Sequence, residues 1–185
     1  MAITLYDSTV GSFLQTLGAV DGFLAKGLAH CKEKNIDPNE MVETRLYPDM
    51  LPLRFQVVAV AHHSAGALAG AKAGKFGPPG PSTADYAALQ KLVSDAKATL
   101  EQVKPEEVNG LEGKDVLFSV GELKLPFKAE GFLMTFSMPN FHFHATTAYD
   151  ILRSKGVPLG KRDYMGRMKL AKQAPSEAPA GGSAF

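Results

Sequence analysis

The sequence has a single cysteine, no tryptophan and almost no net charge. Its one thiol, Cys31, cannot form an intrachain disulfide and cannot build a zinc site from thiolates. Twenty basic and 19 acidic side chains leave a formal net charge of +1, which is not the electrostatic footprint of a nucleic-acid-binding protein. These absences exclude disulfide-stabilised scaffolds, cysteine zinc sites and a nucleic-acid partner.

Long hydrophobic runs are also missing. The longest apolar stretch, residues 55–71, is interrupted by Gln56 and by the polar run His62–Ser64, whereas a membrane span needs about 20 mainly apolar residues. The first residues lack a basic segment followed by an apolar run, so no secretory signal is visible. We therefore expect a cytoplasmic protein that has no membrane partner.

What is present is an ordinary globular composition, with 185 residues, 45% of them hydrophobic and 21% charged. A chain of this length can bury the core of one domain. Apolar residues repeat at helical spacing in four stretches, which are residues 3–34, 48–73, 82–104 and 140–155.

Between the third and fourth helices the period changes. Residues 115–129 alternate between apolar and polar, with a plausible two-residue turn at Gly121 and Glu122, which predicts a β-hairpin. The expected fold is all-α, a four-helix bundle of unusual connectivity with this small hairpin inserted between helices three and four. We expect residues 1–168 to form the domain and the Ala-, Pro-, Gly- and Ser-rich residues 169–185 to form a flexible tail.

Histidine is the residue type with the most chemical promise. His63 shares a helix face with Gln56, and His144 shares one with Asn140, which lies one turn before it. The apolar stripe of the last predicted helix favours an inward orientation of His144. An interior histidine that is simply hydrogen-bonded to a carbonyl group remains an alternative for both histidines.

One stretch near the end of the domain, MPNFHFHATTAYDILR from Met138 to Arg153, resembles an uncharacterised domain-of-unknown-function family in the DinB-like superfamily. The run GVPLGKRD at residues 156–163 and the run LYPDMLPL at 46–53, with Gln56 and His63, are similar to that family too. The resemblance covers roughly residues 3–166. It implies a four-helix bundle that is often homodimeric.

The resemblance also implies candidate metal ligands. Many DinB-like proteins hold a divalent metal with three histidines, one on the second helix and two in a His-x-x-x-His pair on the last. By position, His63 matches the histidine on the second helix, and His144 matches the second histidine of the His-x-x-x-His pair. Asn140 occupies the position of the first histidine of that pair. His63 and His144 are therefore the candidate ligands for Zn, Ni or Mn, and an amide is a poorer ligand for such metals than imidazole.

Three functions are compatible with these observations. The first is a small-molecule-binding module whose polar pocket is lined by Gln56, His63, Asn140, His144 and Tyr149. The second is a divalent-metal-dependent thiol transferase or hydrolase, since some DinB-like proteins are thiol-dependent transferases. The third is a non-catalytic homodimeric bundle. Because two histidines and an amide make a thin set of metal ligands, we favour the binding module and expect a small-molecule ligand and a second copy of the chain as partners.

Overall fold

The computed structural model describes residues 3–170, and its longest element is the helix α1 (Leu5–Lys34). A capping box starts this helix, because Thr4 Oγ1 accepts from the Asp7 amide at 3.1 Å while the Asp7 carboxylate bonds back to Thr4. The helix ends at Asn35, which adopts the left-handed conformation with φ 55°. The predicted helix over residues 3–34 is confirmed.

The second predicted helix begins later than expected. Pro52, not Pro48, is the N-terminal flanking residue, in an extended conformation, and the chain is helical from α3 (Leu53–Ala61) onward. The helix passes through a π-helical turn, η1 (His62–Gly66), and continues as α4 (Ala67–Ala73). The backbone at both junctions stays in the right-handed helical region, so the three segments form one rod.

The third predicted helix is α5 (Tyr86–Glu101). It starts later than the predicted helix over residues 82–104, because its N-cap residue is Asp85 and not Ser82. The Asp85 carboxylate accepts from the Ala88 amide at 2.8 Å. The short helices α2 (Pro38–Val42) and α6 (Pro105–Asn109), which were not predicted, each begin with a proline in the first turn.

A small sheet closes one end of the bundle. Its strands are β1 (Lys75–Phe76), β2 (Asp115–Val120) and β3 (Leu123–Lys128), in that order among the described residues. The predicted hairpin of β2 and β3, with its turn at Gly121, is confirmed. The prediction missed β1, which pairs parallel with β2 because Gly74 ends α4 with φ 70° and turns the chain toward the hairpin. The domain is therefore mostly helical with a small sheet and not purely all-α.

The last long helix starts well before its predicted beginning at Asn140. It runs from α7 (Ala129–Gly131) through a second π-helical turn, η2 (Phe132–Ser137), into α8 (Met138–Ser154). Proline lacks the N–H group that a helix interior needs, so Pro139 favours a helix that begins only after it. The π-helical turn just before Pro139 changes the hydrogen-bond pattern there, which lets the helix continue through the proline.

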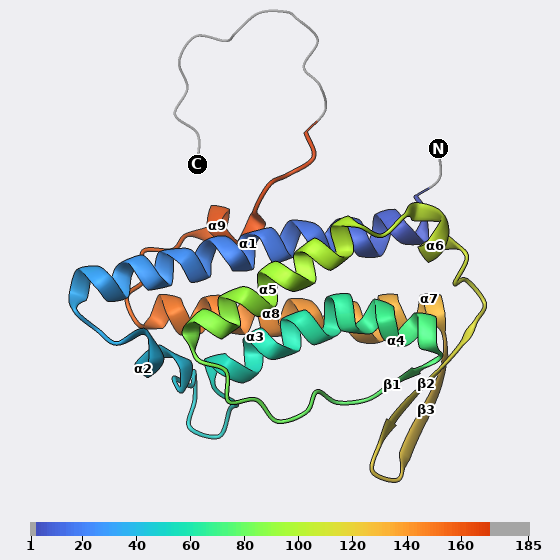
Figure 1. Ribbon diagram of the computed structural model, residues 1–185, viewed down its shortest axis with the longest axis horizontal. Helices are drawn as coiled ribbons and strands as arrows, with labels where there is room; N and C mark the ends of the chain where they lie inside the picture. Colours follow the sequence, from blue (N-terminus) through green and yellow to red (C-terminus); the bar gives the residue numbers. More distant parts are fainter. Residues whose placement is uncertain (1–2, 171–185) are drawn as a thin grey trace, which may run out of the picture.

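The four long helical rods lie side by side, with the sheet at one end and the segment from β1 to α5 running along one edge (Figure 1). A short helix, α9 (Lys161–Met165), follows α8 and contacts α1. Within residues 3–170, no helix is long and apolar enough to cross a membrane. The predicted tail falls largely on residues 171–185, outside the described residues.

Candidate functional site

Two histidines from different helices meet between α3 and α8. His63 lies in η1 and His144 in α8, and their imidazole rings are nearly parallel, with centroids 6.0 Å apart and an interplanar angle of 17°. His63 is buried and His144 is half-buried. We refer to these two residues as the histidine pair.

Gln56 fixes the protonation pattern of His144. The side-chain amide of Gln56 donates to the carbonyl of Leu51 at 2.8 Å, which leaves its oxygen to face Nδ1 of His144 at 2.8 Å. A carbonyl oxygen can only accept a hydrogen bond, so Nδ1 of His144 carries the proton. Nε2 of His144 therefore keeps its lone pair, as in histidines whose other ring nitrogen is held by a second group.

Aromatic rings enclose the histidine pair. His63 contacts Phe76 and Phe136, with ring centroids 5.6 and 5.8 Å away, and His144 contacts Phe55 at 5.6 Å. Phe136 lies in η2 and His63 in η1, so a π-helical turn stands on each side of this contact. Turns of this kind are rare and occur often at functional sites.

Burial keeps the histidine pair uncharged. Desolvation, with smaller contributions from the neighbouring His62 and His144, lowers the pKa of His63 from 6.5 to about 3. Desolvation likewise lowers the pKa of His144 to about 4. Within the described chain, Nδ1 of His63 is buried and has no hydrogen-bond partner. Near pH 7 the two rings can therefore exchange hydrogen bonds with a ligand, but their pKa values are far from those of efficient general acids or bases.

Asn140 stands where the family resemblance would put a third histidine. It lies one turn before His144 on α8, and its side-chain amide donates to the carbonyl of Phe136 at 2.7 Å. Of the Asn140 side chain, the amide oxygen is therefore the atom that remains to act as a ligand. Across residues 3–170, no cluster of three or more histidine, cysteine, aspartate or glutamate side chains is placed to hold a metal ion.

The structure does not bring Tyr149 to the histidine pair, which corrects its predicted place in the pocket. The ring of Tyr149 contacts Phe23 at 6.1 Å and Tyr164 at 6.0 Å, so it faces α1 and α9. The reason is helical geometry, because five residues after His144 the side chain has turned by about 140° around the axis. His142 also faces that side, where Ser12 Oγ lies 3.4 Å from its Nε2.

Residues 5–165 of the sequence match a protein family described as Domain of unknown function (DUF1993). The chain belongs to this family. It is also similar to a solved structure, the crystal structure of a DinB family member protein from Shewanella denitrificans, with 26% identity and a TM-score of 0.72 over 95% of this chain and 96% of that chain. No curated protein matches the sequence. The predicted DinB-like fold is thus confirmed.

Sequence reasoning missed the aromatic residues around the histidine pair of this DUF1993 chain. Phe136 precedes His144 by eight residues, but the predicted helix began at Asn140, so Phe136 was assigned to no helix face. Phe76 belongs to β1, which has only two residues and gives no periodic signal. Phe55 lies directly before Gln56, but neighbouring residues on a helix project about 100° apart, so the spacing did not place Phe55 beside His144.

The substitution Gln56→Glu should raise the pKa of His144 by at least one unit above its value of about 4. A carboxylate 2.8 Å from Nδ1 favours the charged imidazole, whereas the amide of Gln56 is neutral. An NMR titration of the His144 ring resonances measures this shift. Gln102→Glu, at an exposed position, is the control and should leave the titration unchanged; an unchanged His144 in Gln56→Glu would contradict the assigned hydrogen bond.

Proposed function

We propose that this chain is a small-molecule-binding module in which the histidine pair supplies the polar contacts. The observation that carries the proposal is the hydrogen bond between Gln56 and His144. That bond leaves Nε2 of His144 as an acceptor within aromatic surroundings. Preformed sites with a few fixed polar groups among apolar side chains are typical of small-molecule binding.

The surroundings of the histidine pair favour a neutral ligand. Phe55, Phe76 and Phe136 offer ring surfaces, and the two imidazoles carry no charge near pH 7. A charged group placed there would lose its water without gaining a counter-charge. A hydroxyl or N–H group on a flat apolar body would instead donate to Nε2 of His144 and contact the phenylalanine rings. This is the ligand class that we propose.

The same residues do not fit the three-histidine metal centre that the DinB-like resemblance implies. They provide two imidazoles and one amide, and the Asn140 amide is already bonded to its own helix. An amide oxygen binds zinc or nickel more weakly than an imidazole nitrogen does. We therefore propose no catalytic step at a metal ion.

That the chain forms a homodimer and that it is located in the cytoplasm remain predictions.

Phenol is a suitable probe, because it carries one hydroxyl donor on an aromatic ring. We expect phenol at millimolar concentration to shift the ring resonances of His144 in NMR spectra. Toluene, which has no donor, should bind at least tenfold more weakly. His144→Gln should weaken phenol binding at least tenfold, and His30→Gln, which removes a histidine of α1, should not change it. Equal binding of phenol to both variants, or of phenol and toluene to the wild type, would contradict the proposal.

A further inference from the structure

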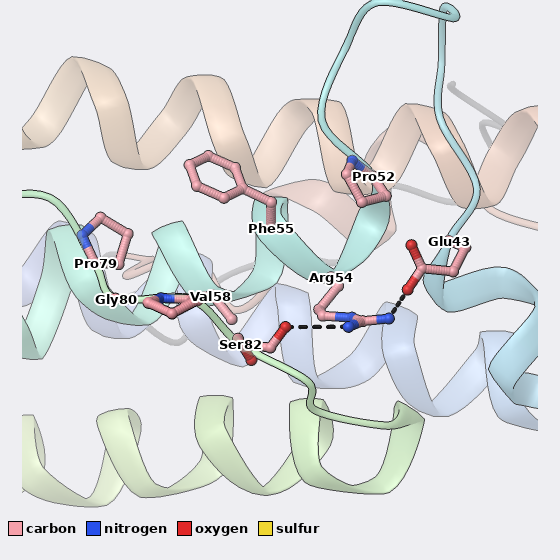
Figure 2. Close-up of a pocket in the computed structure, with 9 residues that line it drawn as sticks. Glu43, Pro52, Arg54, Phe55, Val58, Pro79, Gly80 and Ser82 are labelled. Atoms are coloured by element: carbon pink, nitrogen blue, oxygen red, sulfur yellow. Dashed lines mark hydrogen bonds and ion pairs between the residues drawn. The ribbon is translucent and has the colours of Figure 1, made fainter.

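A cleft that Phe55 also lines combines apolar walls with one arginine. It lies between the first turn of α3 and the segment that leads into α5, and its volume is about 230 Å³ (Figure 2). Its apolar walls come from five side chains, which are Pro52, Phe55, Val58, Pro79 and Pro81. The charged groups at the cleft are Arg54 and Glu43.

Arg54 is held in place by two neighbours but uses only part of its hydrogen-bonding capacity. Its Nη1 donates to the carbonyl of Ser82 at 3.0 Å, and its Nη2 pairs with Glu43 (Figure 2). Its Nε is buried and has no partner in the part of the chain that the structure describes. The Nε and Nη2 groups of a guanidinium form a fork that fits both oxygens of one carboxylate. Glu43 occupies one arm of this fork and leaves the other unused.

The ion pair with Glu43 is easily replaced. The Arg54 side chain is 24% exposed, whereas the Glu43 side chain is 58% exposed and stands at the end of the five-residue helix α2. Exposed ion pairs of this kind contribute about 0–1 kcal/mol, because water solvates the exposed partner almost as well. Glu43 can therefore turn into solvent when another carboxylate binds to the fork.

The start of α3 adds a second attraction for an anion. Pro52 precedes the helix, no side chain caps it, and both Pro52 and Arg54 line the cleft. The first turn of a helix carries the positive end of the helix dipole. In α3 the Leu53 amide already donates to the carbonyl of Thr44 at 2.8 Å, so the attraction for an anion comes from the dipole and the later amides of the turn. The helix and the guanidinium thus both favour a negatively charged group on a ligand, whereas the remaining walls favour a ligand with an apolar body.

We propose that this cleft binds a small carboxylic acid with an apolar body, whose carboxylate displaces Glu43 from Nη2 of Arg54 and also accepts from the unpartnered Nε. The volume of about 230 Å³ is below the range that is common for drug-sized ligands, about 300–1,000 Å³, so the acid is small. The inference does not rest on the proposed function. The two sites share Phe55 but select opposite ligands, since the histidine pair favours neutral donors and Arg54 favours acids.

Benzoate tests the proposal, with benzamide as its neutral isostere and inorganic phosphate as an anion without an apolar body. We expect benzoate to shift the backbone amide resonances of residues 53–58 and of Gly80 and Ser82 in NMR titrations of the full chain. Benzamide and phosphate should bind at least tenfold more weakly. Glu43→Gln should tighten benzoate binding at least threefold, because the competing carboxylate is gone.

Arg54→Gln should weaken benzoate binding at least tenfold, and Arg45→Gln, at an exposed arginine of the neighbouring loop, is the matched control that should bind as the wild type does. If Arg54→Gln does not fold, the exposed Glu43→Gln decides the question by itself. Equal affinity for benzoate and benzamide, equal affinity for benzoate and phosphate, or no tightening in Glu43→Gln would overturn the proposal.

Discussion

Gly27→Ala should lower the free energy of unfolding by about 3 kcal/mol or more, adding the costs of overpacking and of a broken buried hydrogen bond. A Cβ atom at residue 27 of α1 would lie 2.3 Å from Oη of Tyr86. Tyr86 is 2% exposed, and its hydroxyl donates to the carbonyl of Leu24 at 2.8 Å. The ring cannot move aside without breaking that bond and disturbing the packing of α5 on α1.

Two further variants make this test specific. Gly22→Ala, in the same helix, adds a Cβ atom that meets nothing within 4 Å, so it should stabilise the protein by about 0.5–1 kcal/mol through helix propensity. Adding Tyr86→Phe to Gly27→Ala removes the clashing oxygen and should recover part of the loss. Urea unfolding at pH 7 measures all three. If Gly27→Ala and Gly22→Ala had the same effect, the contact between α1 and Tyr86 would be wrong.

The second large effect is a loss of stability in mild acid. His63 has a pKa of about 3 in the folded protein and 6.5 as its ordinary value, so below pH 6.5 the unfolded chain binds a proton that the folded protein refuses. The free energy of unfolding therefore falls as the pH falls from 6.5 toward 3. The contribution of His63 to this loss is about 2–3 kcal/mol at pH 4.5. His144, whose pKa is also lowered, adds to the loss.

The window from pH 6.5 to 4.5 isolates the histidines. The described carboxyl groups with shifted pKa values, those of Asp7, Glu107, Glu130 and Asp163, are all shifted downward from ordinary values of 3.8 or 4.5. These carboxyl groups lose most of their contribution to stability below this window, and the loss only begins near its lower end. His63→Phe should remove about half of the slope that His63 and His144 produce together, since a phenylalanine suits the aromatic surroundings and binds no proton. His62 and His142, whose pKa values burial also lowers, add to the slope that remains. Urea unfolding at each pH measures the slope, and His30→Gln should retain it. A wild type whose stability does not change over the window would contradict the burial of His63.

Helix periodicity predicted the elements of the fold well, because a buried stripe on a long helix repeats several times. The helix α1 followed from its apolar periodicity, and the hairpin of β2 and β3 followed from alternation that is local in the sequence. The two-residue strand β1 did not, since its pairing depends on a partner about 40 residues away. The π-helical turns also escaped prediction. They let a helix pass Pro139, a residue that is read locally as a boundary.

The candidate site was predictable in part. Spacing on a helix placed Gln56 and His63 on one face, and Asn140 and His144 on another, and the structure joins the two faces through the hydrogen bond of Gln56 to His144. Spacing could not reveal the rings that surround the pair, because Phe76 and Phe136 come from elements that were missed. Tyr149 was also predicted to line the pocket, but its position around α8 turns it toward α1 and α9.

The central claim is that His63 and His144 form an uncharged pair and that Gln56 holds the proton on Nδ1 of His144. The most direct test is the pair of ¹⁵N chemical shifts of the His144 ring, followed from pH 7 to pH 3. We predict a protonated Nδ1 and an unprotonated Nε2 at pH 7, with Nε2 gaining its proton only near pH 4. A proton on Nε2 at pH 7, or a midpoint near pH 6.5, would contradict the claim.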